Sequence, residues 1–191
     1  MKLSLRLTLA LTFAGLVFLA ACRQGAPLPV YWTIPGFELT SQSGQPFASK
    51  SLEGNIWVAD FIYTTCPGPC PRMSAIMRGI QSAVKVYPDV KLVSFTVDPK
   101  YDTPAVLARY AAIHHAQSGR WFFLTGNENV LENVCRNGFK LGDVDGSLQH
   151  STRFTLLDRH SRVRGYYSPT EDATAVPHLL RDIRRLESAK S

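Results

Sequence analysis

Two cysteines lie four positions apart in the segment Cys66-Pro67-Gly68-Pro69-Cys70. An apolar run typical of a buried strand precedes this segment and a helical pattern follows it, so both thiols would lie where a helix begins. The positive end of a helix lowers the pKa of a thiol, and the thiolate is the form that binds soft metals and attacks disulfides. The pair therefore predicts either metal binding or thiol-disulfide chemistry.

The loop between the two cysteines is made only of proline and glycine. Redox enzymes of the thioredoxin type usually have two residues between their cysteines, whereas this chain has three. The wider spacing permits a disulfide and also lets two sulfurs spread around an ion. Prolines stiffen the loop and remove backbone donors, and Gly68 permits a sharp turn. A structural disulfide remains an alternative from this spacing alone.

A histidine far along the chain favours metal binding by the cysteine pair over a structural disulfide. His150 follows Cys70 by 80 residues and directly precedes a strand pattern at 151–157, with no apolar stripe beside it that would bury the ring. Two thiolates and an imidazole suit Cu(I), and the imidazole also tolerates Cu(II). A structural zinc site commonly takes a fourth protein ligand. Cys66, Cys70 and His150 are therefore the candidate ligands of a copper ion.

The first 21 residues predict export of the domain that follows. A short basic start is followed by an uncharged apolar run, Leu7 to Ala21, which is shorter than the ~20 residues of a spanning helix. The run ends in Leu19-Ala20-Ala21-Cys22, which resembles a bacterial lipobox and implies cleavage before Cys22 and a diacylglycerol on its sulfur. An uncleaved anchor and an ordinary signal are the alternatives. In each case the domain faces the periplasm or another extracytoplasmic space, where thiols tend to be oxidised.

The charge of the mature chain is mildly positive. Removing residues 1–21 leaves 19 basic and 15 acidic residues, a net charge of +4. The basic residues are dispersed and end in a set on a helical pattern, Arg181, Arg184 and Arg185. We interpret them first as solvated surface, then as attraction to anionic headgroups or an acidic partner. Nucleic acid is not an expected partner in this compartment.

The hydrophobic patterns predict one α/β domain over residues 36–188, with a tether from the lipid over 22–35. A short hairpin is expected after Phe37, and a polar turn at Gly44 lies within it. Buried strands are expected at 56–63, 91–97 and 121–124, helices at 73–84, 104–113 and 130–134, then strands at 152–157 and 163–167 and a helix at 174–186. This order is that of a thioredoxin-like fold, a central mixed sheet flanked by helices, with an inserted helix and strand. Right-handed crossovers would place Cys66 at the carboxyl edge of the sheet.

Three separated motifs resemble the Sco (SenC/PrrC) family of copper chaperones over essentially the whole domain. They are Asp60-Phe61-Ile62-Tyr63-Thr64-Thr65-Cys66-Pro67 with Cys70-Pro71, Ser94-Phe95-Thr96-Val97-Asp98-Pro99 with Asp102-Thr103-Pro104, and His150-Ser151 followed by Phe154 and Leu156-Leu157-Asp158. The resemblance implies a thioredoxin-like fold and Cys66, Cys70 and His150 as ligands of Cu(I) or Cu(II), with the carboxylate of Asp98 shaping the site. It also implies delivery of copper to the copper A centre of cytochrome c oxidase, with an upstream copper donor and a thiol reductant as further partners.

One departure and two other activities bear on this interpretation. Many relatives carry an acidic residue where this chain has Gly68, so one negative charge beside the metal is absent. A thiol-disulfide oxidoreductase would need Cys66 and Cys70 but not His150, and a peroxidase is a weaker alternative because the second cysteine is too close. The resemblance thus favours a metal carrier over an enzyme. Cys135 and the two methionines Met73 and Met77 lie on helical apolar faces and are expected in the core.

Overall fold

The computed structural model describes residues 26–141 and 151–189. Within them, seven strands form one mixed sheet in the order β2-β1-β5-β4-β3-β6-β7. The strands are β1 (Glu38–Ser41), β2 (Pro46–Ala48), β3 (Ile56–Ile62), β4 (Val90–Thr96), β5 (Trp121–Thr125), β6 (Phe154–Leu157) and β7 (Val163–Tyr167). The predicted thioredoxin-like fold is confirmed, including the hairpin β1–β2 and the inserted helix and strand.

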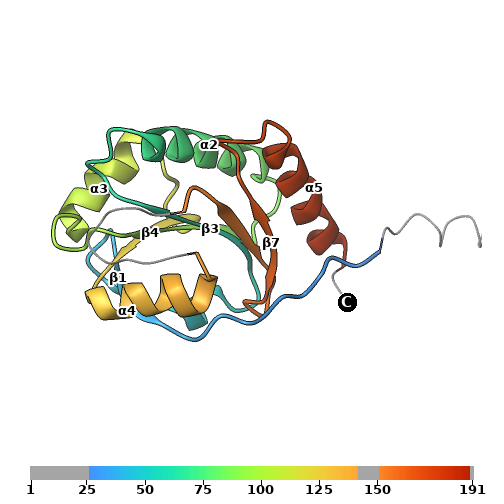
Figure 1. The fold of residues 1–191 in the computed structure, drawn as a ribbon, viewed down its shortest axis with the longest axis horizontal. Helices are drawn as coiled ribbons and strands as arrows, with labels where there is room; N and C mark the ends of the chain where they lie inside the picture. Colours follow the sequence, from blue (N-terminus) through green and yellow to red (C-terminus); the bar gives the residue numbers. More distant parts are fainter. Residues whose placement is uncertain (1–25, 142–150, 190–191) are drawn as a thin grey trace, which may run out of the picture.

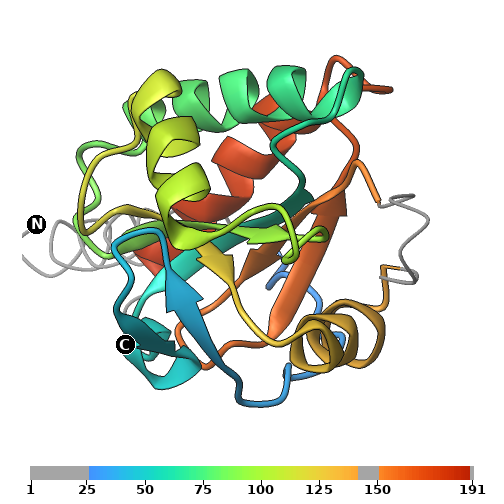
Figure 2. The same ribbon diagram turned by 90° about the vertical axis from the view of Figure 1, so that its left-hand side faces the viewer.

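Helices cover both faces of the sheet (Figures 1 and 2). On one face lie α2, α3 and α5, and on the other lies α4, which continues into the π-helix η2. Their bounds are α2 (Pro69–Ala83), α3 (Pro104–Ile113), α4 (Glu128–Asn133), η2 (Val134–Phe139) and α5 (Ala175–Ser188), with a short 3₁₀-helix η1 (Ser49–Leu52). Each predicted helix is present, and the one predicted at 130–134 is longer because the chain adds the π-turn of η2.

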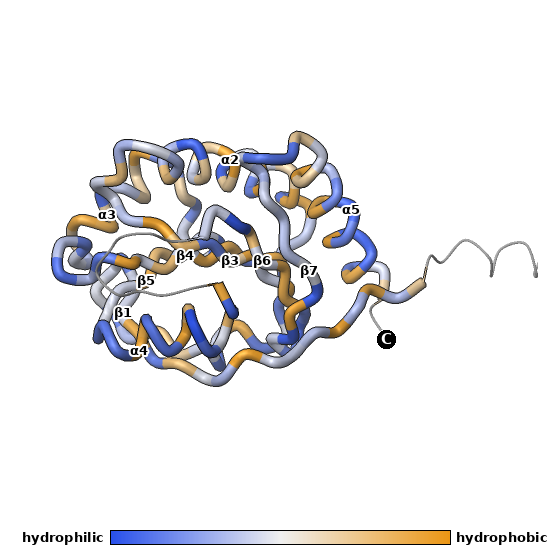
Figure 3. Tube along the Cα trace, in the orientation of Figure 1, coloured by the Kyte–Doolittle hydropathy of each residue, from blue (hydrophilic) through white to orange (hydrophobic). Residues whose placement is uncertain are grey.

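Two hydrophobic cores, one on each side of the sheet, follow from the composition of β3. All seven residues of this strand are buried, as expected of a strand covered on both faces. Ile56, Val58 and Ile62 pack with α2, α3 and α5, whereas Trp57 and Phe61 pack with η2 on the other face. The apolar positions accordingly concentrate along the central strands (Figure 3).

The strand directions explain why one edge of the sheet gathers the candidate site. Strand β4 pairs parallel with β3, from Ile56 opposite Val90 to Ile62 opposite Thr96, so the loops that follow these strands leave from the same edge. Strand β6 pairs antiparallel with β3, with Ala59 opposite Thr155. The chain therefore enters β6 at the same edge where it leaves β3. This carboxyl edge is where the cysteine loop begins.

The domain begins earlier than predicted, because part of the expected tether is docked on it. The Tyr31 amide donates to Val163 O (3.0 Å) and the Val163 amide donates to Trp32 O (2.8 Å). The buried Arg164 guanidinium donates to Leu28 O and to Pro29 O, at 2.7 and 2.8 Å. A buried guanidinium needs acceptors for its donors, and these carbonyls supply them. Residues 28–35 are therefore part of the folded domain rather than a free tether.

The predicted signal segment, 1–21, and the predicted lipidation site, Cys22, lie outside the described residues. Across residues 26–141 and 151–189, no helix is long and apolar enough to cross a membrane.

Candidate functional site

The two cysteines lie together at the carboxyl edge, as the sequence predicts. The chain turns directly after β3, and the Cys66 amide donates to Tyr63 O at 3.3 Å. Helix α2 then begins at Pro69 with Gly68 before it, so Cys70 is the second residue of the helix. The Cys66 residue is 6% exposed and Cys70 is fully buried. No disulfide links the described cysteines, so the pair is in its dithiol form.

The prolines of the loop direct the backbone donors of the helix start onto one sulfur. The first turn of a helix has N–H groups without a partner inside the helix. Pro69 and Pro71 have no N–H, so the donors left at this helix start are those of Gly68 and Cys70. Both donate to the sulfur of Cys66. The sequence therefore concentrates the positive end of α2 on Cys66.

The two thiols differ in acidity because they differ in burial and in donors. Burial opposes the thiolate of Cys66, but the amides of Cys70 and Gly68, with the side chains of Cys70 and Tyr63, outweigh it and lower the pKa of Cys66. Burial raises the pKa of Cys70, and the neighbouring thiolate of Cys66 raises it further. In the dithiol form Cys66 is thus the nucleophilic sulfur, and Cys70 keeps its proton and donates it in a hydrogen bond.

Tyr63 is a contact of the site that the sequence did not single out. Its hydroxyl donates to the sulfur of Cys66, and this bond is the main cause of the raised pKa of Tyr63. The charges of Cys66, Cys70 and Asp98 act in the same direction. The predicted carboxylate of Asp98 thus lies within electrostatic reach of the residues around the sulfur. In the sequence, Tyr63 stands at the end of an apolar strand. An aromatic side chain at that position indicates a core residue and not a contact of the site.

A second missed residue, Asp102, ties the cysteine loop to the end of β4. Its carboxylate is fully buried and accepts from the Thr64 amide (3.1 and 3.3 Å), the Thr64 hydroxyl (2.5 Å) and the Thr96 hydroxyl (2.5 Å). By sequence pattern, Asp102 and Thr103 are equivalent as caps of α3. The structure separates them, because Thr103 accepts from the Val106 amide and Asp102 turns toward the loop. Asp102 therefore fixes the backbone two residues before Cys66.

Replacing Asp102 with asparagine should lower the free energy of unfolding by about 1–3 kcal/mol. The side-chain NH₂ group of asparagine cannot accept, so at least one donor from Thr64 or Thr96 loses its partner. Urea unfolding of the reduced protein measures the change. The half-buried Asp98, changed to asparagine, is the matched control and should shift stability by less than about 0.5 kcal/mol. Equal effects of the two substitutions would show that Asp102 does not hold the loop.

A buried carboxyl group, Asp60, lies beneath this site on the side of the sheet that α2 covers. It is fully buried, and its Oδ1 accepts from the Ser94 hydroxyl (2.5 Å), which in turn accepts from Trp121 Nε1 (3.0 Å). Among the described residues, its Oδ2 has no hydrogen-bond partner. Burial raises the pKa of Asp60 to about 7. The charge of Asp60 also contributes to the raised pKa of Cys70, which shows that the two groups interact.

The remaining predicted residues fall into two groups. His150 lies outside the described residues, and within the described ranges no three His, Cys, Asp or Glu side chains gather as a metal site. Cys135 lies within η2 and is buried in the core on the face of the sheet opposite Cys66 and Cys70, so it is not a third thiol of this site. Met73 and Met77 are fully buried core residues, as predicted.

Comparison with known proteins assigns the chain to a family. The family model described as SCO1/SenC matches residues 30–186, so the chain belongs to the SCO1/SenC family. A SCO1 protein homologue of Bacillus subtilis is 31% identical over 186 residues, which are 93% of this chain and 96% of that protein. A Stutzerimonas stutzeri protein whose name describes it as copper-binding is 31% identical over 150 residues, 73% of this chain and 71% of that one.

Solved structures of relatives agree with this assignment. A SCO1/SenC family lipoprotein of Bacillus anthracis superposes with a TM-score of 0.75 at 33% identity, covering 82% of this chain and 95% of that one. BsSco, described as a member of the Sco family of cytochrome c oxidase assembly proteins and as having a disulfide switch, superposes with a TM-score of 0.74 at 29% identity, covering 86% and 100%. Both likenesses cover more than four fifths of this chain.

Proposed function

We propose that this protein is an exported copper carrier that binds one Cu(I) or Cu(II) ion through Cys66, Cys70 and His150. It passes the ion by ligand exchange to the copper A centre of a cytochrome c oxidase. The observation that carries the proposal is the reduced thiol pair at the carboxyl edge, where the amides of Gly68 and Cys70 and the Tyr63 hydroxyl donate to the sulfur of Cys66 and lower its pKa. Two sulfurs on one loop suit the soft Cu(I) ion.

The topology around β6 supports His150 as the third ligand. The strand β6 is antiparallel to β3, so the residues that lead into it approach the end of β3 from which the cysteine loop leaves. His150 directly precedes that segment in the sequence. Asp98 adds a carboxylate whose charge acts on Tyr63, the residue that donates to the sulfur of Cys66. A Cys-Cys-His set with a nearby carboxylate is consistent with both oxidation states of copper.

The relatives support the partners and the location. The Stutzerimonas stutzeri relative is described as copper-binding, BsSco belongs to a family described as assembling cytochrome c oxidase, and the Bacillus anthracis relative is described as a lipoprotein. By analogy, we assign to this chain a diacylglycerol on Cys22, an extracytoplasmic domain, an upstream copper donor and a thiol reductant. Ligand exchange between donor, carrier and oxidase avoids the release of free copper.

Copper titration of the protein in its two thiol states tests the proposal. The reduced chain should bind one equivalent of copper, and the chain with a Cys66–Cys70 disulfide should bind none, because a disulfide sulfur has no thiolate to donate. The change Cys135→Ser is the matched control, since that thiol lies in the opposite core and its loss should leave the stoichiometry at one. Stoichiometric binding by the oxidised chain would contradict the assignment of the two sulfurs.

A thiol-disulfide oxidoreductase is the second candidate, favoured by the unequal acidity of the two thiols. Cys66 as thiolate would attack a disulfide of the partner, form a mixed disulfide and release one partner thiolate. Cys70, after losing its proton, would then attack Cys66 and release the second partner thiol. The balance is one dithiol oxidised and one disulfide reduced. Turnover of an oxidised oxidase subunit by the metal-free protein with a dithiol reductant, at rates typical of enzymes, would favour this activity over carriage of copper.

A further inference from the structure

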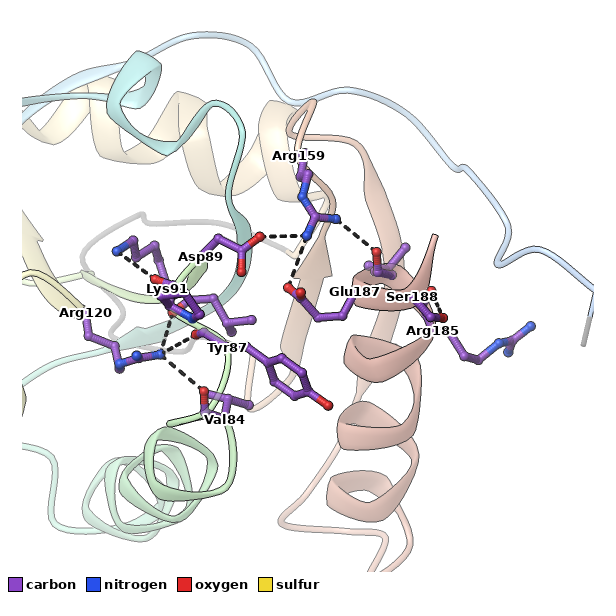
Figure 4. A network of polar contacts seen from close by, with 12 residues as sticks. Val84, Tyr87, Asp89, Lys91, Arg120, Arg159, Arg185, Glu187 and Ser188 are labelled. Carbon is purple, nitrogen blue, oxygen red and sulfur yellow. Dashed lines mark hydrogen bonds and ion pairs between the residues drawn. The ribbon is translucent and has the colours of Figure 1, made fainter. Parts of the chain in front are cut away.

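The end of the domain opposite the cysteines carries a group of exposed cations that the proposed function does not use. We call this group the basic pole. Its cations are Lys85, shortly after α2, and Arg181, Arg184 and the half-buried Arg185 on α5, and it also includes the exposed apolar residue Val86, which follows Lys85. The Tyr87 side chain, next to Val86, lies between the ends of these two helices (Figure 4).

Arg159 fixes this end of α5 to the sheet. Its guanidinium donates to Asp89 (2.7 Å), to Glu187 (3.2 Å) and to Leu186 O (2.9 Å), as Figure 4 shows for the two carboxylates. Asp89 directly precedes β4, so the end of α5 lies at the amino ends of the parallel strands β3 and β4. Cys66 follows the carboxyl end of β3. The length of this strand, about 23 Å at ~3.3 Å per residue, separates the two ends.

The basic pole keeps a net positive charge after its acids are counted. Asp182 is shared by Arg181 and Arg185, at 3.3 Å each, and its second oxygen accepts from Tyr167. Asp89 and Glu187 are both paired with Arg159. No ion pair to Lys85 or Arg184 is present among the described residues. The side chains therefore present more positive than negative charge to solvent, and Val86, which directly follows Lys85, is 66% exposed.

The chain leaves the domain beside this same end. The Arg185 guanidinium donates to the carbonyl of Ala26, the first described residue. Four residue steps separate Ala26 from Cys22, and a chain spans at most ~3.6 Å per residue, so Cys22 is within about 14 Å of that carbonyl. A diacylglycerol on Cys22 would thus hold the Ala26 end of the basic pole near a bilayer surface, at a distance of less than two Debye lengths of ~8 Å in physiological salt.

We propose that the basic pole docks on anionic phospholipid headgroups, with Val86 at the bilayer interface, so that Cys66 and Cys70 face away from the membrane. The proposal rests on the predicted lipid at Cys22 and not on the binding of copper. Cations beside a lipid anchor add electrostatic attraction to anionic headgroups, which favours one orientation of the anchored domain on the membrane.

The test measures which end of the lipidated full-length protein touches the bilayer. Val86→Trp places a reporter on the basic pole, and Tyr101→Trp places a matched reporter at the opposite end, where Tyr101 is 55% exposed. Each variant is reconstituted in nanodiscs of phosphatidylglycerol and phosphatidylcholine whose acyl chains are brominated near the headgroup. Relative to the wild-type protein, the reporter at 86 should be quenched several-fold more than the reporter at 101. Mass spectrometry of the amino-terminal peptide checks the lipid on Cys22 separately.

Charge variants then test the mechanism. Lys85→Gln with Arg184→Gln should abolish most of the quenching at position 86, and so should pure phosphatidylcholine. Arg109→Gln with Lys140→Gln removes two exposed cations elsewhere and should leave the quenching unchanged.

Four results would overturn the proposal. A chain without lipid on Cys22 removes the reason to expect the pole at the membrane. Equal quenching at the two reporters, or quenching insensitive to the Lys85 and Arg184 changes, shows that the pole is not the docking surface. Absence of quenching at position 86 in a lipidated chain would show that the basic pole does not contact the bilayer, and an acidic protein surface would then be its expected partner. None of these results alters the copper stoichiometry, which tests the proposed function.

Discussion

The variant His150→Ala should lose stable copper binding while Cys66 and Cys70 still form a disulfide. Two thiolates alone leave the ion without its third ligand. Removing a residue that only orients a ligand costs about 10–100-fold in affinity, so loss of a ligand itself should cost more. Competition with a Cu(I) chelator measures the affinity, and thiol counting after mild oxidation measures the disulfide. This separation distinguishes a carrier, which needs the imidazole, from an oxidoreductase, which does not.

The control for this experiment is His178→Ala. His178 is exposed on α5, far along the chain from the cysteine loop, and its loss should leave affinity and disulfide formation unchanged. Stoichiometric copper at wild-type affinity in His150→Ala, together with normal oxidase assembly, would rule out the carrier as proposed here. A loss of disulfide formation in the same variant would instead indicate that the substitution disturbs the loop.

The second large effect is expected on stability at Asp60. The pKa of this carboxyl is about 7 in the folded chain, against 3.8 for an ordinary aspartate. The folded state therefore binds more protons than the unfolded state between these values, and stability falls as pH rises from about 4 to about 7. Each tenfold difference in proton affinity between the two states is worth about 1.4 kcal/mol, so the loss approaches about 4 kcal/mol above pH 7. Asp60→Asn should remove this loss.

Denaturant unfolding of the reduced wild-type and Asp60→Asn proteins at pH 4.5 and pH 8 measures the effect. The two chains should be similar in stability at the lower pH, and the variant should be the more stable at the higher pH. Glu38→Gln, an exposed carboxyl on β1, is the control and should follow the wild type at both values. A variant less stable than the wild type at pH 8 would show that the ionised carboxylate is favoured in the core, contrary to the argument from burial.

The sequence predicted the fold well because its elements depend on local patterns. Strand β3 is apolar on both faces and precedes a loop of cysteines and prolines, and that combination placed Cys66 and Cys70 at a helix start. The contacts of the site were not predictable in this way. Asp102 meets Thr64 across 38 positions of sequence, and Asp60 meets Ser94 across 34. Both carboxyls look like ordinary polar residues until the sheet brings β3 and β4 together.

The amino-terminal segment shows a different limit. Its prolines and its lack of periodicity predicted a tether, yet residues 28–35 are docked on β7. The cause is a buried arginine, Arg164, whose donors need carbonyl acceptors that β7 itself does not supply. A segment that pairs through its backbone carbonyls leaves no pattern in its side chains. The place where the described chain begins, at Ala26, follows from this docking and not from any motif.

The paired prolines of α2 have a consequence for the redox chemistry of the loop. The N-cap residue of α2, Gly68, has no side chain to accept from the first turn, and the sulfur of Cys66 instead accepts from the amides of Gly68 and Cys70, as an oxygen of serine or aspartate does at other helices. A disulfide between Cys66 and Cys70 would neutralise the cap. The stability of the first turn of α2 therefore depends on whether the Cys66–Cys70 pair is reduced. The reduced pair is also the form that can bind a metal ion, so the order of this turn would report that state.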